Sequence, residues 1–180
     1  MSTQRFSRRS RRTLLVLHLL SVATWIGVDV MVAVFVGVSL TSDDPSTVGL
    51  CFQALAYVVW PMLTAALATL VTGVLLGWGS AYGVVKHKWV LTKLVINLVL
   101  STLILIALMP GLDELAQRGA DLVAGRTQDM SAGDLVYPPI VSLTSLSFAV
   151  VLSVFKPWGR TRWGRPAAAR TARSTTAASR

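Results

Sequence analysis

The chain has 180 residues, of which 53% are hydrophobic and only 14% are charged. This composition excludes an ordinary soluble domain and is typical of an integral membrane protein. The net charge of +9 would suit a nucleic-acid-binding protein, but most of the basic residues lie in the two tails, which indicates membrane topology and no nucleic-acid partner. These tail residues are Arg5, Arg8, Arg9, Arg11, Arg12, Lys156, Arg160, Arg162, Arg165, Arg170, Arg173 and Arg180.

Residues 13–40 form the first predicted span. A spanning helix needs about 20 apolar residues, and this longer run is interrupted only by His18 and Asp29 as ionisable residues. Arg11 and Arg12, just before the run, also resemble the start of a twin-arginine export signal. The apolar run is far longer than the roughly 7 to 15 residues of such a signal, so we expect a retained span.

Three further apolar stretches predict spans at residues 57–78, 89–109 and 140–155. In the second stretch, Pro61 lacks a backbone N–H and is expected to kink or restart the helix, so that the membrane part begins at residue 57. A Pro-Gly pair directly follows the third stretch and predicts its end. The sequence therefore predicts an all-α fold, a four-helix transmembrane bundle spanning residues 13–156.

Residues 110–139 separate the third and fourth spans and are predicted to form an external, partly helical loop. Five of the eight acidic residues of the chain lie in this segment. The helical part is indicated by four apolar residues at the spacing of one helix face, Leu112, Leu115, Leu122 and Val123.

The distribution of Lys and Arg predicts the orientation of the bundle. The loop at residues 41–47 has no basic residue, the next loop has Lys86 and Lys88, and the third has only Arg118 and Arg126. With two basic tails, this pattern predicts that both termini are cytoplasmic. We expect a multi-pass protein of the bacterial cell membrane.

The tails are predicted to be basic cytoplasmic segments at residues 1–12 and 157–180. The second is rich in Ala, Arg, Ser and Thr without an apolar period, so we expect it to be disordered and to contact anionic lipid headgroups. Aromatic side chains near the membrane boundaries predict an interfacial belt of Trp60, Trp78, Trp89 and Trp158.

Three ionisable residues, His18, Asp29 and Lys93, fall inside the predicted spans, where each costs about 2.5 to 3.5 kcal/mol near the centre. His18, Val22, Trp25 and Asp29 share one face of the first helix. His18 and Lys93 lie at similar depth, so they are predicted to share a cytoplasmic-side site. A neutral imidazole is a ligand for haem iron, copper or zinc. The simpler interpretation is that His18 hydrogen-bonds a neighbouring helix and Lys93 snorkels to the interface.

Asp29 lies nearer the other side of the membrane, level with Pro61, Thr64 and Ser142 if the helices are straight. We expect hydroxyl groups or the carbonyls freed by the proline as its partners. Burial favours the protonated carboxyl, so Asp29 is either a structural aspartate or a site for a proton or cation.

Several short elements resemble a group of small bacterial membrane proteins. This group contains an uncharacterised family of predicted four-span integral membrane proteins, the copper-resistance D (CopD) family and the HemJ-type protoporphyrinogen oxidases. The elements are a first-span histidine followed seven residues later by tryptophan, a proline and a Thr-Gly pair in the second span, and W-x-x-x-K in the third. They are represented here by His18, Trp25, Pro61, Thr72, Gly73, Trp89 and Lys93.

The resemblance to the oxidases implies His18 as a ligand to the iron of haem b and Lys93 as a further cofactor-binding residue. This chain departs from the oxidases after the tryptophan, because Val28-Asp29-Val30 replaces a Leu-Pro-Arg motif. The resemblance to the copper proteins implies ligands on the external side, whereas His18 is predicted on the cytoplasmic side.

The function therefore has three interpretations from different classes. The chain is a haem-binding redox protein, a component that transports copper, protons or another small ion, or a non-catalytic partner in a membrane complex or homo-oligomer. No motif of a hydrolase or kinase is present, and the one cysteine, Cys51, cannot form an intrachain disulfide.

Overall fold

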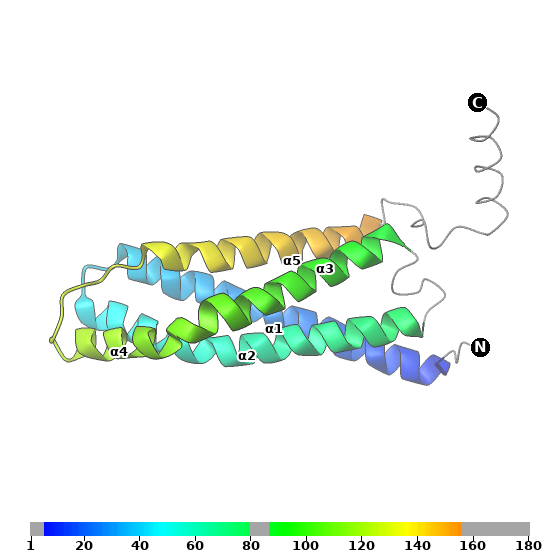
Figure 1. Cartoon of the computed structure of the whole chain (residues 1–180), viewed down its shortest axis with the longest axis horizontal. Coiled ribbons are helices and arrows are strands. Elements are labelled where there is room, and N and C mark those ends of the chain that lie inside the picture. Colours follow the sequence, from blue (N-terminus) through cyan, green and yellow to red (C-terminus); the bar gives the residue numbers. More distant parts are fainter. Residues whose placement is uncertain (1–5, 80–86, 156–180) are drawn as a thin grey trace, which may run out of the picture.

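The computed structural model describes residues 6–79 and 87–155, and these residues form helices without a β-strand. Four helical stretches are long and apolar enough to cross a membrane (Figure 1). The all-α four-helix prediction is therefore confirmed, and the protein is an integral membrane protein with several spans. The predicted tail at residues 157–180, Lys86 and Trp158 lie outside the described residues. The four stretches are Arg8–Thr41, Pro45–Trp78, Lys88–Val123 and Gly133–Phe155.

Helices α1 (Arg8–Thr41) and α2 (Pro45–Trp78) form an antiparallel pair joined by a short turn. The Asp44 carboxylate accepts hydrogen bonds from the backbone N–H groups of Ser46 (3.2 Å) and Thr47 (3.0 Å), and it therefore caps the start of α2. Hydrogen bonds from Thr47 and Ser46 hold the pKa of Asp44 below its usual range. The turn is thus fixed by local hydrogen bonds.

Pro61 does not interrupt α2, which continues as one helix from Pro45 to Trp78. The helix therefore does not restart at the proline, which was one of the two expectations for it. The residues around the proline are buried against the other helices, and neighbouring helices can compensate for the one backbone hydrogen bond that proline removes. The buried residues nearest to it are Val59, Met62, Leu63, Ala65 and Ala66.

The helical chain of the third span does not break at the Pro-Gly pair as expected. Helix α3 (Lys88–Leu103) passes into a π-helical segment η1 (Ile104–Leu108) and a 3-10 segment η2 (Met109–Gly111), and then into helix α4 (Leu112–Val123). The changed hydrogen-bond pattern accommodates Pro110, which cannot donate an α-helical bond. The predicted loop at residues 110–139 is therefore helical for almost its first half.

Helix α4 packs against the first turns of α2 through two glycines. A Cβ atom built on Gly49 would lie 2.5 Å from the carbonyl oxygen of Gly119, and one built on Gly119 would lie 2.6 Å from that of Gly49. Only glycine permits backbones to approach this closely. Leu122 of α4 is buried beside them, with 1% of its surface exposed.

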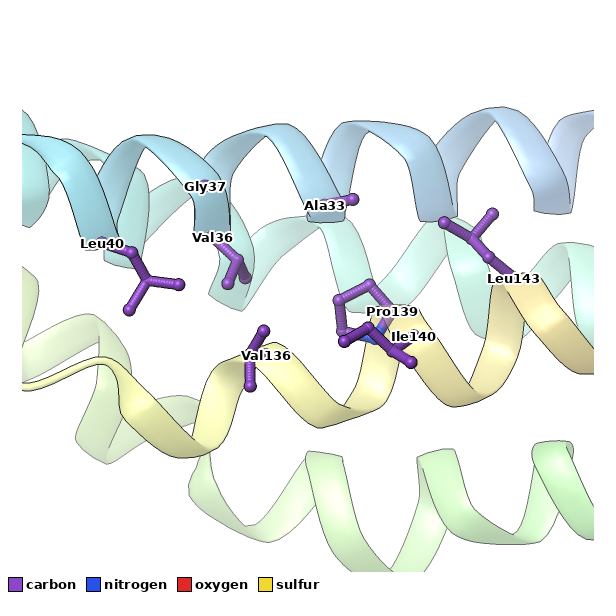
Figure 2. Close-up of a pocket in the computed structure, with 8 residues that line it drawn as sticks. All are labelled: Ala33, Val36, Gly37, Leu40, Val136, Pro139, Ile140 and Leu143. Carbon is purple, nitrogen blue, oxygen red and sulfur yellow. The ribbon is translucent and has the colours of Figure 1, made fainter.

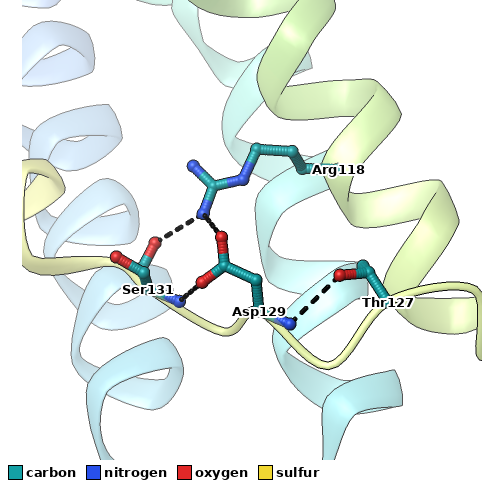
Figure 3. Close-up of polar contacts among 4 residues, drawn as sticks. All are labelled: Arg118, Thr127, Asp129 and Ser131. Atoms are coloured by element: carbon teal, nitrogen blue, oxygen red, sulfur yellow. Dashed lines mark hydrogen bonds and ion pairs between the residues drawn. The ribbon is translucent and has the colours of Figure 1, made fainter.

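The segment that follows α4 is held by polar contacts (Figure 3). The Arg118 guanidinium donates to the Ser131 carbonyl over 2.9 Å and forms an ion pair with Asp129 at 3.5 Å. The Asp129 carboxylate also accepts from the Ser131 N–H at 3.0 Å, and the Asp129 N–H donates to Thr127 Oγ1 at 3.2 Å. These contacts lead the chain to η3 (Gly133–Val136) and helix α5 (Tyr137–Phe155).

The buried apolar residues form two clusters along the bundle. One cluster is near the middle and includes Trp25, Ala66, Leu100 and Leu146 from all four long helices. The other lies at the end of the bundle where α4 packs, which we call the α4 end. The opposite end, where α1 and α3 begin and α2 and α5 end, is called the terminal end (Figure 1).

Exposed aromatic residues agree with a membrane around the middle cluster. Trp60 and Trp78 of α2 have 56% and 74% of their surface exposed and are separated by 18 residues. This separation is about 27 Å of helix, close to the roughly 30 Å thickness of the hydrocarbon layer. The aromatic belt stays a prediction that suits this spacing, and α4 extends past the Trp60 level.

Candidate functional site

His18 is half-buried on α1 and contacts α2. Its Nδ1 atom lies 2.9 Å from Thr72 Oγ1, and a Cβ atom built on Gly73 would lie 3.2 Å from its Cε1 atom. The Thr-Gly pair therefore supplies both a hydrogen-bond partner and the space for the ring. The structure thus explains why Thr72 and Gly73 occur together, which the resemblance alone did not.

The hydrogen bonds around Thr72 favour one tautomer of His18. When the Thr72 hydroxyl donates to the Ala68 carbonyl over 2.6 Å, its oxygen accepts from the Nδ1–H group of the ring. In this tautomer, which is assigned from the bond pattern, Nε2 carries the lone pair and can accept a proton or bind a metal.

Lys93 of α3 contacts a different helix. Its Nζ atom donates to Ser153 Oγ on α5 over 2.9 Å and lies 4.7 Å from the centre of the Trp89 ring. His18 and Lys93 were predicted to share a site, and the structure gives them different hydrogen-bond partners. They are held by separate helix pairs, since His18 bonds α2 and Lys93 bonds α5.

Asp29 is buried in α1, with 1% of its surface exposed. Its Oδ2 atom accepts a hydrogen bond from Ser142 of α5 at 2.5 Å, which confirms the expected hydroxyl partner. Thr64, the other hydroxyl expected at this level, instead donates to the Trp60 carbonyl at 2.9 Å. Among the described residues, the ion pairs of the structure do not include Asp29.

Sequence reasoning missed three polar residues inside the bundle, and it named Trp25 only as a residue on the face of His18 and Asp29. Thr69, Asn97 and Ser101 are buried, with 6%, 8% and 3% of their surface exposed, and Trp25 is completely buried. None of the three polar residues is ionisable, and a tryptophan inside an apolar run is normally read as packing. The available signal was a polar residue inside the second apolar stretch, Thr69, and a pair at helical spacing in the third, Asn97 and Ser101.

A separate apolar groove lies between α1 and the start of α5 and has a cavity volume of about 230 Å³ (Figure 2). It is close to the α4 end and away from His18. None of its lining side chains is an acid, a base or a metal ligand, so it is no candidate for cofactor binding. The lining residues are Ala33, Val36, Gly37, Leu40, Val136, Pro139, Ile140 and Leu143.

No family model matches the chain, and no match was found among the curated proteins or the solved structures. The class of protein rests on the structure alone: four long apolar helices with buried polar side chains define a multi-pass membrane protein. Within residues 6–79 and 87–155, no three His, Cys, Asp or Glu side chains gather as a metal site.

Proposed function

We propose that this membrane protein binds and transfers protons through its helix bundle. The observation that supports the proposal is the placement of two proton-exchanging groups, His18 and Asp29, on one face of α1 inside the bundle. They are about 16 Å apart along the helix axis, which is half of the hydrocarbon thickness. Neither haem binding nor a non-catalytic role in a membrane complex requires a buried carboxyl at this position.

The chemistry of the two groups suits proton exchange. In the tautomer that donates from Nδ1 to Thr72, His18 offers Nε2 as an acceptor. Asp29 has a hydroxyl partner, Ser142, and a carboxyl in apolar surroundings without a cation is stable when protonated and costly when charged. A group that can hold a proton and release it into a polar path is what a proton relay requires.

Proton flux into liposomes that contain the purified protein tests the proposal. A pH-sensitive dye inside the liposomes reports the flux after a pH step, and protein-free liposomes give the background. We expect His18→Gln to lower the flux, because glutamine keeps a hydrogen-bonding group near Thr72 but cannot exchange a proton. Flux equal to the protein-free background in the unaltered protein would refute the proposal.

A second candidate function is binding of haem b, as implied by the resemblance to the HemJ-type oxidases. The observation in its favour is that the second nitrogen of His18 is held by Thr72, since metal-ligating histidines are usually oriented by such a hydrogen bond. His18 would hold the haem iron, and the resemblance implies Lys93 as a further cofactor-binding residue. A bound haem would supply one-electron redox chemistry.

Absorption spectra of the detergent-purified protein, oxidised and dithionite-reduced, separate the two candidates. Haem binding predicts a Soret band in protein from haem-supplied cells, and its loss in His18→Ala. A colourless protein with measurable proton flux would remove the haem candidate and leave the proton proposal in place.

We also propose that the terminal end of the bundle faces the cytoplasm of a bacterial cell, where the basic tails would contact anionic lipid headgroups. The support is the difference in Lys and Arg between the two ends. Reporter fusions after Ser46 and after Gly125 are both expected to report the outer side. A cytoplasmic signal from either fusion would reverse or reject this orientation.

A further inference from the structure

Two polar atoms in the middle of the bundle lack a partner among the described residues. They are the indole Nε1 of Trp25 and Oγ1 of Thr69. Both residues are more than nine-tenths buried, with 0% and 6% of their surface exposed. Buried polar groups in proteins are almost always hydrogen-bonded, to protein atoms or to bound water, and in a membrane the cost of leaving them unpaired is higher still.

The helix register brings these two atoms to the same side of the middle cluster. Trp25 packs in one cluster with Met62 and Ala66 of α2, and Thr69 is three residues beyond Ala66 toward the terminal end. A helical side chain points toward the N-terminus of its own helix, and for Trp25 this is also the terminal end. The indole therefore extends from Ala66 toward the level of Thr69.

Helix α3 adds two more buried polar groups at this level. Leu100 belongs to the same cluster as Trp25, and Asn97 and Ser101 lie on either side of it in the sequence. The Ser101 hydroxyl donates to the Asn97 side-chain oxygen over 3.4 Å, a long bond that leaves both N–H donors of the amide unused by Ser101.

We infer that Trp25, Thr69, Asn97 and Ser101, here called the polar layer, bind water inside the bundle. The layer lies between His18, which is bonded to Thr72 one turn from Thr69, and Asp29, which is one turn from Trp25 on the same face of α1. A bound water takes part in about three hydrogen bonds, and these four side chains supply both donors and acceptors.

The inference deepens the proposed function and, as a route for protons, rests on it. Water in the polar layer connects the terminal end, at His18, with the carboxyl of Asp29. A proton enters the water chain at one end while another leaves at the opposite end, so that no net charge stays in the apolar interior. Whether water binds in the polar layer is a separate question, and it can be measured without the proton-flux assay.

Nuclear magnetic resonance of the full chain in detergent, labelled with ¹⁵N at the indole nitrogens, tests the hydration. Trp25→Phe identifies the Trp25 signal. We expect a cross-peak between the Trp25 indole proton and water in the unaltered protein, and its loss in Thr69→Val. Thr64→Val is the matched control, because Thr64 is exposed on the same helix and bonds the Trp60 carbonyl.

The outcomes separate the inference from the proposed function. Absence of the cross-peak from the unaltered protein, or its persistence in a folded Thr69→Val variant, would refute the hydrated layer. If Thr69→Val does not fold, Thr69→Ser takes its place, because serine keeps the hydroxyl and must retain the cross-peak. Loss of the cross-peak in a folded Thr69→Ser variant would then refute the hydrated layer. If the cross-peak is present but Asp29→Asn has the same proton flux as the unaltered protein, the hydrated layer stands and the proton-transfer function is rejected.

Discussion

Replacing Asp29 by asparagine is expected to lower proton flux in liposomes about a hundredfold, the lower part of the range for a positioned proton-transfer group. Asparagine has nearly the same shape and can accept the hydrogen bond from Ser142, so the bundle should remain folded. It cannot take up or release a proton in the physiological range. The loss of flux would therefore reflect chemistry and not the loss of a helix contact.

Asp43→Asn provides the control for this experiment. Asp43 is an exposed acid in the turn between α1 and α2, so its replacement changes the net charge equally without touching the bundle interior. We expect flux close to that of the unaltered protein. Equal flux in Asp29→Asn and Asp43→Asn would show that Asp29 is only a structural partner of Ser142.

The second large effect is expected at the contact between α2 and α4. Gly49→Ala should lower the stability of the bundle by about 1–3 kcal/mol, the usual cost of overpacking. The upper part of this range is expected, because the new methyl group would lie 2.5 Å from a backbone oxygen and 2.9 Å from Leu122, and the backbone cannot move away as a flexible side chain can. The two helices would have to separate.

Thermal unfolding in detergent, followed with a thiol-reactive dye, measures this effect. Cys51 is the one cysteine of the chain, is buried, and lies two residues from Gly49, so its thiol becomes reactive when this region opens. Gly27→Ala is the control, since a Cβ atom built there has no other atom within 4 Å. An unfolding temperature of Gly49→Ala equal to that of Gly27→Ala would contradict the close contact of α2 and α4.

The spans could be predicted from the sequence because their cause is local. About 20 apolar residues in a row are needed to cross a membrane, and this requirement is visible without any tertiary structure. The partner of Asp29 was also predictable, because straight antiparallel helices place Ser142 at the same height. These inferences needed only the rise of a helix and the order of the spans.

The remaining features depend on contacts between helices that the sequence does not reveal. Pro61 and Pro110 normally end helices, but here packing on neighbouring helices and a change to π and 3-10 hydrogen bonding keep the chain helical. The role of Thr72 as partner of His18 required the pairing of α1 with α2. Three members of the polar layer, Thr69, Asn97 and Ser101, were not singled out because each is an uncharged residue within an apolar run.

The most direct test of the central claim is the infrared spectrum of Asp29 while the pH of the surrounding solution is changed. The difference between the unaltered protein and Asp29→Asn isolates the C=O band of the protonated carboxyl. We expect this band to be present, to shift in Ser142→Ala, and to rise and fall as the pH is cycled, because the proton exchanges with the solution. A band that never responds to pH, or a carboxyl that is ionised throughout, would contradict a proton-transfer role for Asp29.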